Sequence, residues 1–442
     1  MWVPLAGGTL GALPAAVAQG NAAFALDPSP PAKERSLPDR LPEKPSLPPA
    51  MTIPVEPLGF TPPGPIYLGQ QNTLVSLDFL DENRLLFTFR VPGLMHRETG
   101  DSAEGVERQI RALVLTLPAG TVQAEALWTV HDRARYLWML KDGHFLFRDR
   151  ESLQQGDAAL DLKPFLRFPG PLLLLGLDPS QHFLVTQSRE PAEAANKPGE
   201  VPSPATSAAT LIPDGQKPSK QAALEQPDVV VRILRRDSGQ VMLVSRTRAT
   251  VHLAINPDGY LESLRGNGEK WVLNLNYFSG GSAVLGHFDS ACSPTVEFIS
   301  EREALATACS PSGGHHLVAM DTGGRRLWES RSSSSVAWPL LVRSAGGLRF
   351  ARETVVLNRS ANDYSRTLDA EDVKGQLVRV FDAADGNPAL EAPASPVLDA
   401  GGNVAVSPSG GRVAVLNGGA IQVFELPSPP SLPESGSAET GR

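Results

Sequence analysis

The sequence predicts an all-β fold, a β-propeller of seven blades, each blade a four-stranded antiparallel sheet. Three observations predict it. Short runs of alternating apolar residues recur along the chain, turns rich in Gly, Asp, Asn, Pro or Ser separate them, and the pattern repeats at about the 40-residue length of a propeller blade. Hardly any stretch has the 3.6-residue period of an amphipathic helix.

The alternating runs form hairpins, because a period of two residues puts the apolar side chains on one face of a strand. A second strand pair follows each hairpin, and the clearest examples are residues 317–330 and 377–393. Such a four-stranded unit cannot bury both faces alone, so it must pack against neighbouring units arranged in a ring. The seven predicted hairpins span residues 75–89, 135–149, 173–187, 251–264, 296–309, 340–353 and 403–417.

The two ends of the propeller are expected to pair with each other. Residues 418–427 form one further strand that has too few partners for a blade of its own. We expect the segment around Ile66–Leu68 to pair with it, so that N- and C-terminal strands close the ring. Closure removes free sheet edges, which otherwise promote aggregation.

Changes in composition set the domain boundaries. Residues 1–26 resemble a signal peptide that lacks a positively charged n-region, and residues 27–65 form a Pro-rich tether. The propeller occupies residues 66–426, interrupted by a disordered insert at 190–227 that is rich in Pro, Ala, Lys and Glu. A polar, disordered tail of Pro, Ser and Gly follows at 427–442.

The N-terminal segment bears on where the protein works. Its apolar composition and its small-x-small sites at 16–18 and 23–25 resemble the core and cleavage site of a signal peptide, which predicts a periplasmic or secreted protein. Translation from Met51 would delete this segment and leave a cytoplasmic protein. No apolar run reaches the ~20 residues of a membrane-spanning helix, so we expect no membrane span.

The sequence contains two cysteines, Cys292 and Cys309, and they flank the predicted hairpin at 294–308. If they face each other across this hairpin, export would oxidise them to a disulfide. The alternative is two buried thiols in neighbouring strands. Two thiols without a Cys-x-x-Cys motif make a thiolate zinc site unexpected.

The charge pattern bears on the partner. The formal net charge is −8, and no basic stripe runs along the sequence, which argues against a nucleic-acid partner. Propellers commonly work as monomers and no coiled-coil heptads occur, so we expect a monomer, although the sequence leaves the oligomeric state open.

Two blades carry motifs of known propeller families. The stretch AMDTGGRRLW (319–328) resembles the blade motif of quinoprotein-like propellers, in which Ala-x-Asp precedes Thr-Gly and Trp. The stretch VFDAADG (380–386) resembles the end of a WD40 blade, with Phe381 in place of the usual Trp. The closing region is similar to exported propellers of high-GC soil bacteria, a family without an assigned activity. The resemblance covers residues 66–426 as architecture, and it implies a seven- or eight-bladed ring but no particular substrate.

Catalytic residues remain unknown from the sequence. Gly-x-Ser-x-Gly, a P-loop lysine, a dinucleotide-binding glycine motif and His-Glu-x-x-His are all missing, so no cofactor and no metal are expected. His315 and His316 are adjacent on a strand and point to opposite faces, which prevents them from sharing a metal ion.

We interpret Asp258, Asp321 and Asp382 as turn residues, because Asp accepts hydrogen bonds from its own backbone there. The strand tryptophans, which we interpret as wedges between blades rather than a ligand cage, are Trp128, Trp138, Trp271, Trp328 and Trp338.

Two functions follow from these expectations. The first is an exported propeller that acts as a scaffold for a protein or peptide partner, with its loops or channel mouth as the binding surface. The alternative is a propeller enzyme that acts on a sugar or another small polar substrate through carboxylates in the channel. The residues lining the channel discriminate between the two.

Overall fold

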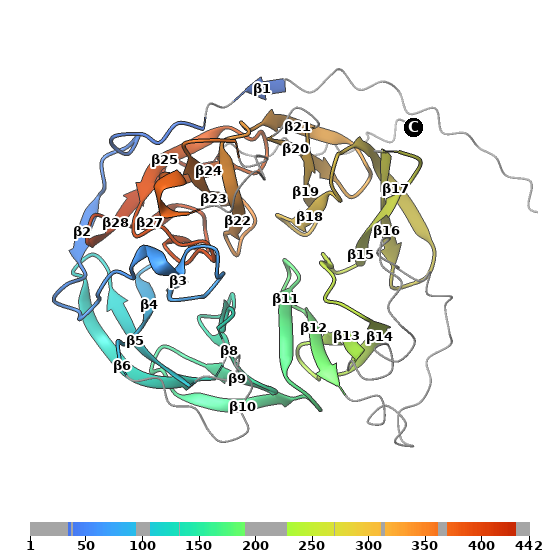
Figure 1. Ribbon diagram of the computed structural model, residues 1–442. Helices are drawn as coiled ribbons and strands as arrows, with labels where there is room; N and C mark the ends of the chain where they lie inside the picture. The colour runs from blue at the N-terminus through green and yellow to red at the C-terminus, as the bar shows by residue number, and fades with distance from the viewer. Residues whose placement is uncertain are drawn as a thin grey trace, which may run out of the picture. The chain divides into compact units, whose positions relative to one another are not determined.

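The structure is a computed structural model that describes residues 34–36, 39–93, 107–131, 133–190, 228–268, 270–310, 314–360 and 369–429. Seven sheets, antiparallel except for one added N-terminal strand, follow one another around a central axis (Figure 1). The described residues contain no α-helix, and none of their helices could span a membrane. The predicted all-β propeller of seven blades is therefore confirmed. The predicted signal peptide (1–26) and nearly all of the predicted insert (190–227) and tail (427–442) lie outside the described residues.

Sheets 1 to 3 each contain four strands, and the first strand of each sheet lies nearest the central axis (Figure 1). In each of these sheets the chain order of the strands is also their spatial order. These sheets consist of β3 (Val75–Asp81), β4 (Arg84–Arg90), β5 (Arg108–Thr116) and β6 (Thr121–Val130); β7 (Leu137–Met139), β8 (Phe145–Asp149), β9 (Ser152–Gly156) and β10 (Leu162–Arg167); and β11 (Leu172–Leu177), β12 (Phe183–Glu190), β13 (Asp228–Arg235) and β14 (Val241–Thr247).

Sheets 4 to 7 repeat the arrangement with two variations: sheet 4 has three strands, and N-terminal strands join the outer edges of sheets 5 and 7. The inner strand expected for sheet 4 is reduced to a bridge between Ile255 and Tyr260 and a 2.8 Å hydrogen bond from Leu261 N–H to Ala254 O. These sheets consist of β15 (Gly259–Arg265), β16 (Lys270–Tyr277) and β17 (Ser282–Asp289); β18 (Thr295–Phe298), β19 (Glu303–Cys309), β20 (His315–Asp321), β21 (Arg326–Arg331) and β1 (Glu34–Ser36); β22 (Val336–Arg343), β23 (Arg349–Leu357), β24 (Val373–Asp382) and β25 (Pro388–Ala394); and β26 (Val404–Val406), β27 (Arg412–Asn417), β28 (Ala420–Glu425) and β2 (Met51–Pro54).

A hydrophobic cluster lies between each pair of neighbouring sheets, including the last and the first. Between sheets 5 and 6, Trp328 stacks on Phe350 and Phe381, and its indole N–H donates a 2.8 Å hydrogen bond to Ala383 O. Trp128 and Trp138 are buried in two other clusters, so their interpretation as wedges between blades is confirmed.

The strand that completes sheet 7 differs from the one expected. Met51–Pro54 (β2), and not the segment around Ile66–Leu68, pairs antiparallel with β28. Residues 65–67 form the 3-10 helix η1 (Pro65–Tyr67) instead. The prediction was wrong because the prolines that precede η1 lack the N–H groups a ladder requires, whereas Ile53 and Val55 supply alternating apolar side chains to the core.

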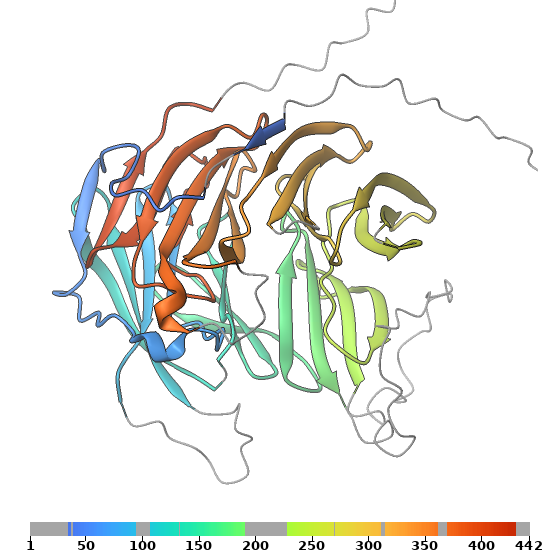
Figure 2. The ribbon, with the colours of Figure 1, turned by 45° about the horizontal axis from the view of Figure 1, so that its top comes forward.

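The N-terminal strap, defined here as residues 34–36 and 39–60, runs along sheets 5, 6 and 7 (Figures 1 and 2). It begins with β1, which pairs in parallel with β21. Over sheet 6, Leu41 packs against three buried aliphatic side chains, and Ser46 N–H donates a 2.8 Å hydrogen bond to Glu391 O. It ends with Phe60 in the cluster between sheets 7 and 1. Part of the segment expected to be a tether is therefore packed on the propeller.

Two further local features support sheets 5 and 6. A disulfide joins Cys292 to Cys309 at the base of the β18–β19 hairpin, with Cα atoms 5.5 Å apart. The 3-10 helix η3 (Ala370–Asp372) precedes β24 and has a capping box, in which Asp369 caps the first turn.

The pairing of β2 predicts a large difference between adjacent residues. Ile53 is 5% exposed and lies in the cluster between sheets 7 and 1, whereas Thr52 is exposed. We expect Ile53→Ala to lower the free energy of unfolding by about 2–5 kcal/mol, because it leaves a cavity in that cluster. Thr52→Ala, the control, should change it by less than about 0.5 kcal/mol. Equal effects in urea denaturation would show that β2 does not pack on sheet 7.

The disulfide predicts a second stability effect. Its cysteines are 17 residues apart, and a loop of that size restricts the unfolded chain by about 3 kcal/mol. We expect the double variant Cys292→Ser, Cys309→Ser to lose that amount in chemical denaturation, and reduction of the wild type to reproduce the loss. Two titratable thiols in the purified wild-type protein, with no loss in the variant, would contradict the bond.

Candidate functional site

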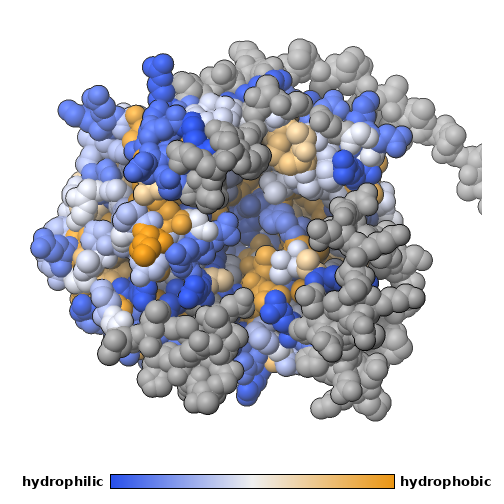
Figure 3. Space-filling view, viewed as in Figure 1, coloured by the Kyte–Doolittle hydropathy of each residue, from blue (hydrophilic) through white to orange (hydrophobic). Residues whose placement is uncertain are grey.

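The centre of the ring holds a group of charged side chains. Figure 3 shows this face hollowed at its centre, with hydrophilic residues beside apolar ones in the recess. Asp78 lies on β3, Arg135 just before β7, Glu297 on β18 and Arg343 at the end of β22. These four residues, called the central charge cluster below, come from sheets 1, 2, 5 and 6, so only the ring brings them together.

Arg135 is the most accessible member of the cluster. Its Nε donates a 2.9 Å hydrogen bond to Leu137 O, and its guanidinium lies 5.4 Å from the centre of the Trp138 ring. Burial lowers the pKa of Arg135, and the carboxylates of Asp78 and Glu297 partly offset that shift. The Arg135 side chain is nevertheless exposed to solvent. Both observations fit a group in an open recess, where protein surrounds the side chain on most sides and solvent still reaches it.

Asp78 is the carboxylate partner of Arg135. It is half-buried on the inner strand of sheet 1 and accepts a 2.5 Å hydrogen bond from the Ser76 hydroxyl. Burial raises the pKa of Asp78, while the Arg135 charge and the Ser76 hydrogen bond act in the opposite direction. The desolvation that would hold a proton on this carboxyl is thus opposed by a guanidinium from the next sheet.

Arg343 connects opposite sides of the ring. Its Nη1 donates a 2.8 Å hydrogen bond to Phe298 O in sheet 5, and its Nη2 donates to Leu177 O at the end of β11 in sheet 3. Burial lowers the pKa of Arg343, and Glu297 and Asp178 raise it. One side chain therefore spans from sheet 6 to sheet 3 and occupies the space between them at this level of the ring.

The cluster combines carboxylates and guanidinium groups. Its two carboxylates, Asp78 and Glu297, are both under the influence of the same guanidinium, Arg135. At Asp78 the Arg135 charge opposes the upward pKa shift that burial causes, and burial outweighs it. The cluster presents groups of both charges to anything that enters the recess.

The residues singled out in the sequence lie elsewhere. Asp321 accepts hydrogen bonds from Gly323 N–H and Arg325 N–H, so its interpretation as a turn residue is confirmed. Asp382 pairs with Arg349, whose Nε lies 2.7 Å from a carboxylate oxygen.

His315 and His316 do not share partners: His316 lies 3.0 Å from Glu329, and burial lowers the pKa of His315 to about 4. Within the described ranges, no group of three or more His, Cys, Asp or Glu side chains is arranged to hold a metal ion.

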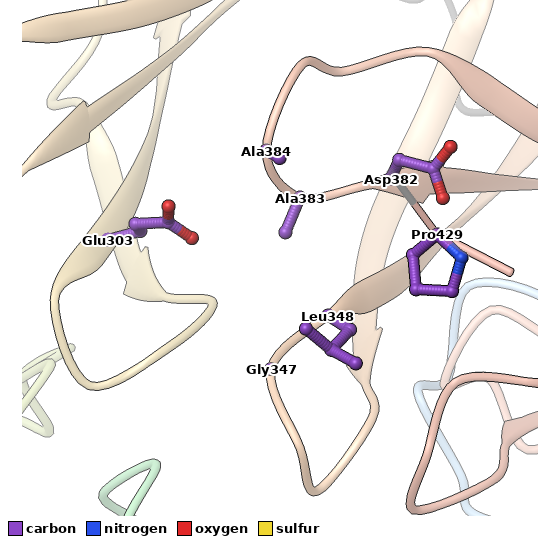
Figure 4. Close-up of a pocket in the computed structure, with 7 residues that line it drawn as sticks. All are labelled: Glu303, Gly347, Leu348, Asp382, Ala383, Ala384 and Pro429. Atoms are coloured by element: carbon purple, nitrogen blue, oxygen red, sulfur yellow. The ribbon is translucent and has the colours of Figure 1, made fainter. Parts of the chain in front are cut away.

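A small cavity lies between the turns of sheets 5 and 6. Figure 4 shows Glu303 on one side and Asp382 on the other, with Leu348 and Ala383 between them. Burial raises the pKa of Glu303, and the Ser300 hydroxyl partly offsets this. The cavity volume is about 20 Å³, which is room for a single water molecule, so it is no substrate site.

Glu353 is a carboxyl whose pKa burial shifts strongly. It is fully buried between sheets 6 and 7, where Gln376 Nε2 donates a 2.5 Å hydrogen bond to it. Burial raises the pKa of Glu353 to about 8, and the hydrogen bond from Gly402 N–H only partly offsets this. Gln376 also bonds to Leu398 and Asn403, so the carboxyl belongs to a buried network that links the sheets.

The sequence did not single out the central charge cluster. A weak signal was present: Ser76 and Asp78 occupy the polar positions of the alternation in β3. That pattern places them on the face opposite the apolar residues but does not show that this face meets charges from other sheets. Arg135 lies outside any strand, so alternation gave no signal for it.

No family model and no curated protein matches the chain. Among solved structures, acylaminoacyl peptidase of Pyrococcus horikoshii is similar with a TM-score of 0.43 at 10% identity, over 78% of this chain and 50% of that one. TolB of Acinetobacter baumannii has a TM-score of 0.35 at 13% identity, over 74% and 75%. Hydrazine synthase of Kuenenia stuttgartiensis has a TM-score of 0.35 at 13% identity, over 63% and 72%. The chain spans about half the length of the peptidase, and similarities of this size carry no argument about function.

The pKa of Glu353 predicts a pH dependence of stability. The folded protein holds this proton up to about pH 8, whereas an unfolded carboxyl releases it near its ordinary value of 4.5. The free energy of unfolding therefore falls as pH rises from 4.5 to 8, by at most about 1.4 kcal/mol per pH unit from this group. We expect Glu353→Gln to gain stability relative to wild type across that window in urea denaturation. Parallel pH profiles for the two proteins would contradict the assignment.

Proposed function

We propose that this chain is a binding scaffold whose central recess takes a segment of a protein or peptide partner. The observation that carries the proposal is the central charge cluster, which presents two cations and two anions from four sheets. The ring holds them rigidly, because each sheet is packed on both faces. Rigid, pre-placed charges lose little conformational entropy on binding.

The mixed charge favours a peptide over a nucleic acid. A peptide segment presents N–H and C=O groups along its backbone and side chains of both signs, which matches a recess that has guanidinium donors beside carboxylate acceptors. Nucleic acid would meet Asp78 and Glu297 as repulsive charges. Arg343 bonds across the ring, so we propose that the partner segment enters from one face and ends inside the recess.

We further propose that the protein works in the periplasm or outside the cell. Support comes from the Cys292–Cys309 pair, whose joined geometry suits an oxidising compartment. The proposed partner is accordingly an exported protein or an exposed peptide segment.

The alternative, an enzyme acting on a sugar or another small polar substrate, has one observation in its favour. Burial raises the pKa of Asp78, as expected for a general acid in a channel. A second carboxylate free of a cation would complete such a site, and Glu297 interacts with both Arg135 and Arg343. Binding therefore accounts for more of the cluster than catalysis does.

A peptide-display selection tests the proposal. Random linear peptides are selected on the immobilised wild-type protein, and the enriched peptides are measured by isothermal titration calorimetry against Arg135→Ala. We expect at least a tenfold loss of affinity, because charge-assisted hydrogen bonds to an accessible guanidinium contribute about 1.5–3 kcal/mol.

The matched control is Arg325→Ala, which removes the same charge from an exposed turn where Arg325 pairs only with Asp321 among the described contacts. It should bind the selected peptides as the wild type does. The proposal fails if the peptides bind Arg135→Ala with unchanged affinity. Turnover of a sugar substrate that is abolished by Asp78→Asn would establish the alternative.

A further inference from the structure

A second cavity lies between the inner strands of sheets 5 and 6, next to the central charge cluster. Its volume is about 50 Å³. Glu297, which influences the pKa of both Arg135 and Arg343, forms part of its wall, so the cavity borders the recess. Thr295 and Pro339 are exposed at its mouth, while Leu305 and Leu317 are buried at its base.

Arg352 lies at the buried end of this cavity. It is 5% exposed, and it faces sheet 5 because Phe350, two residues earlier on β23, packs there against Trp328. No described residue accepts a hydrogen bond from its Nη2 atom. A buried guanidinium donor without an acceptor costs free energy that a well-placed anion would recover.

The neighbouring arginine shows what Arg352 lacks. Arg379 is the cross-strand partner of Arg352 on β24, and it has two carboxylates: Nη1 lies 3.1 Å from Asp39, and Nε lies 2.6 Å from Glu391. Asp39 also accepts a 2.6 Å hydrogen bond from Ser333 N–H. These carboxylates therefore bind other donors, and among the described residues neither forms an ion pair with Arg352.

Arg352 keeps its positive charge at neutral pH although it is buried. Burial lowers its pKa to about 10, with Asp39 acting to raise it and Arg379 to lower it. It remains a cation at neutral pH. His315, whose pKa is lowered to about 4 in part by Arg352, is uncharged there and does not compete for an anion.

We propose that this cavity binds the C-terminal carboxylate of a partner segment, with Arg352 as the anion-binding residue and Leu305 and Leu317 against a small terminal side chain. The inference rests on the proposed function, because it names which part of the partner enters from the recess. A guanidinium pairs with a carboxylate through two parallel hydrogen bonds, which a neutral end group cannot reproduce.

The other walls restrict the ligand further. A cavity of about 50 Å³ has room for a terminal carboxylate and a methyl-sized group but not for a large side chain. Glu297 at the wall repels any anion in the cavity; pairing with Arg352 offsets this repulsion for the terminal carboxylate but not for the side chain of a terminal Asp or Glu, which is therefore disfavoured. Thr295 and Thr307 supply hydroxyl groups for the last peptide unit. The site therefore selects a C-terminal Ala or a residue of similar size.

The probe is acetyl-Ala-Ala-Ala with a free carboxylate, titrated into the full chain by isothermal titration calorimetry. The same peptide with a C-terminal amide tests the carboxylate, and acetate tests whether a free small acid suffices. We expect the free peptide to bind at least tenfold more tightly than either. Equal binding of the amide, tighter binding of acetate, or no binding of the free peptide would each overturn the proposal.

Variants assign the binding to the cavity. Arg352→Gln should lose at least tenfold in affinity, and Arg352→Lys should recover part of it, because lysine keeps the charge without the bidentate geometry. Arg325→Gln, the charge-matched control, should bind as the wild type does. If Arg352→Gln does not fold, Thr295→Trp at the exposed mouth blocks the cavity without disturbing the core, and unchanged binding there would refute the site.

The two proposals fail in different ways. Peptides selected on the recess that lose affinity in Arg135→Ala but not in Arg352→Gln would leave the binding scaffold standing and refute the C-terminal site. Binding of acetyl-Ala-Ala-Ala that depends on Arg352, together with selected peptides insensitive to Arg135→Ala, would support the C-terminal site and refute the role of the central charge cluster in binding.

Discussion

The packing of one sheet on the next is the constraint on which the rest of this protein depends. Each sheet has apolar side chains on both faces, and only its two neighbours can cover them, so a hydrophobic cluster forms at each of the seven interfaces. The last sheet needs an outer strand, and β2 supplies it from the N-terminal strap. The strap thereby ties sheets 5, 6 and 7 together from outside, and the prolines that keep it extended also keep it from forming structure of its own.

The same constraint concentrates charge at the centre and at selected interfaces. Inner strands converge on the axis, where their polar side chains meet from several sheets with limited water, so each carboxylate requires a cation nearby. On β23, the alternation of side chains sends Arg352 toward sheet 5 and Glu353 toward sheet 7. These two adjacent ionisable residues therefore differ in charge at neutral pH. Glu353 is uncharged within a hydrogen-bonded network, and Arg352 keeps its charge beside a cavity.

These features give one account of how the scaffold would hold a partner. The central charge cluster offers fixed charges of both signs, Arg343 limits how far a segment can pass, and the cavity beside Glu297 offers an end point for it. Asp78, Glu297 and Arg343 lie on strands, and Arg135 lies two residues before β7, so recognition would depend on pre-placed side chains. The interface between sheets 5 and 6 has two different halves. Its buried half contains Trp328 and Phe350, and its other half contains polar and charged groups.

The sequence by itself determined the all-β class, six of the hairpins in full, the blade repeat and the position of the two cysteines at the base of one hairpin, because alternation and turn chemistry are local properties. It could not identify β2, since a short apolar run within a Pro-rich segment has no local sign of its partner 370 residues away (Thr52 pairs with Gln422). It also could not find the site. Asp78, Arg135, Glu297 and Arg343 are ordinary surface-type residues in their own segments, and Arg352 differs from its neighbour only by the face it occupies. Their chemistry arises from long-range electrostatics and burial, which exist only once the sheets are stacked around the axis, and that is what the tertiary structure alone decided.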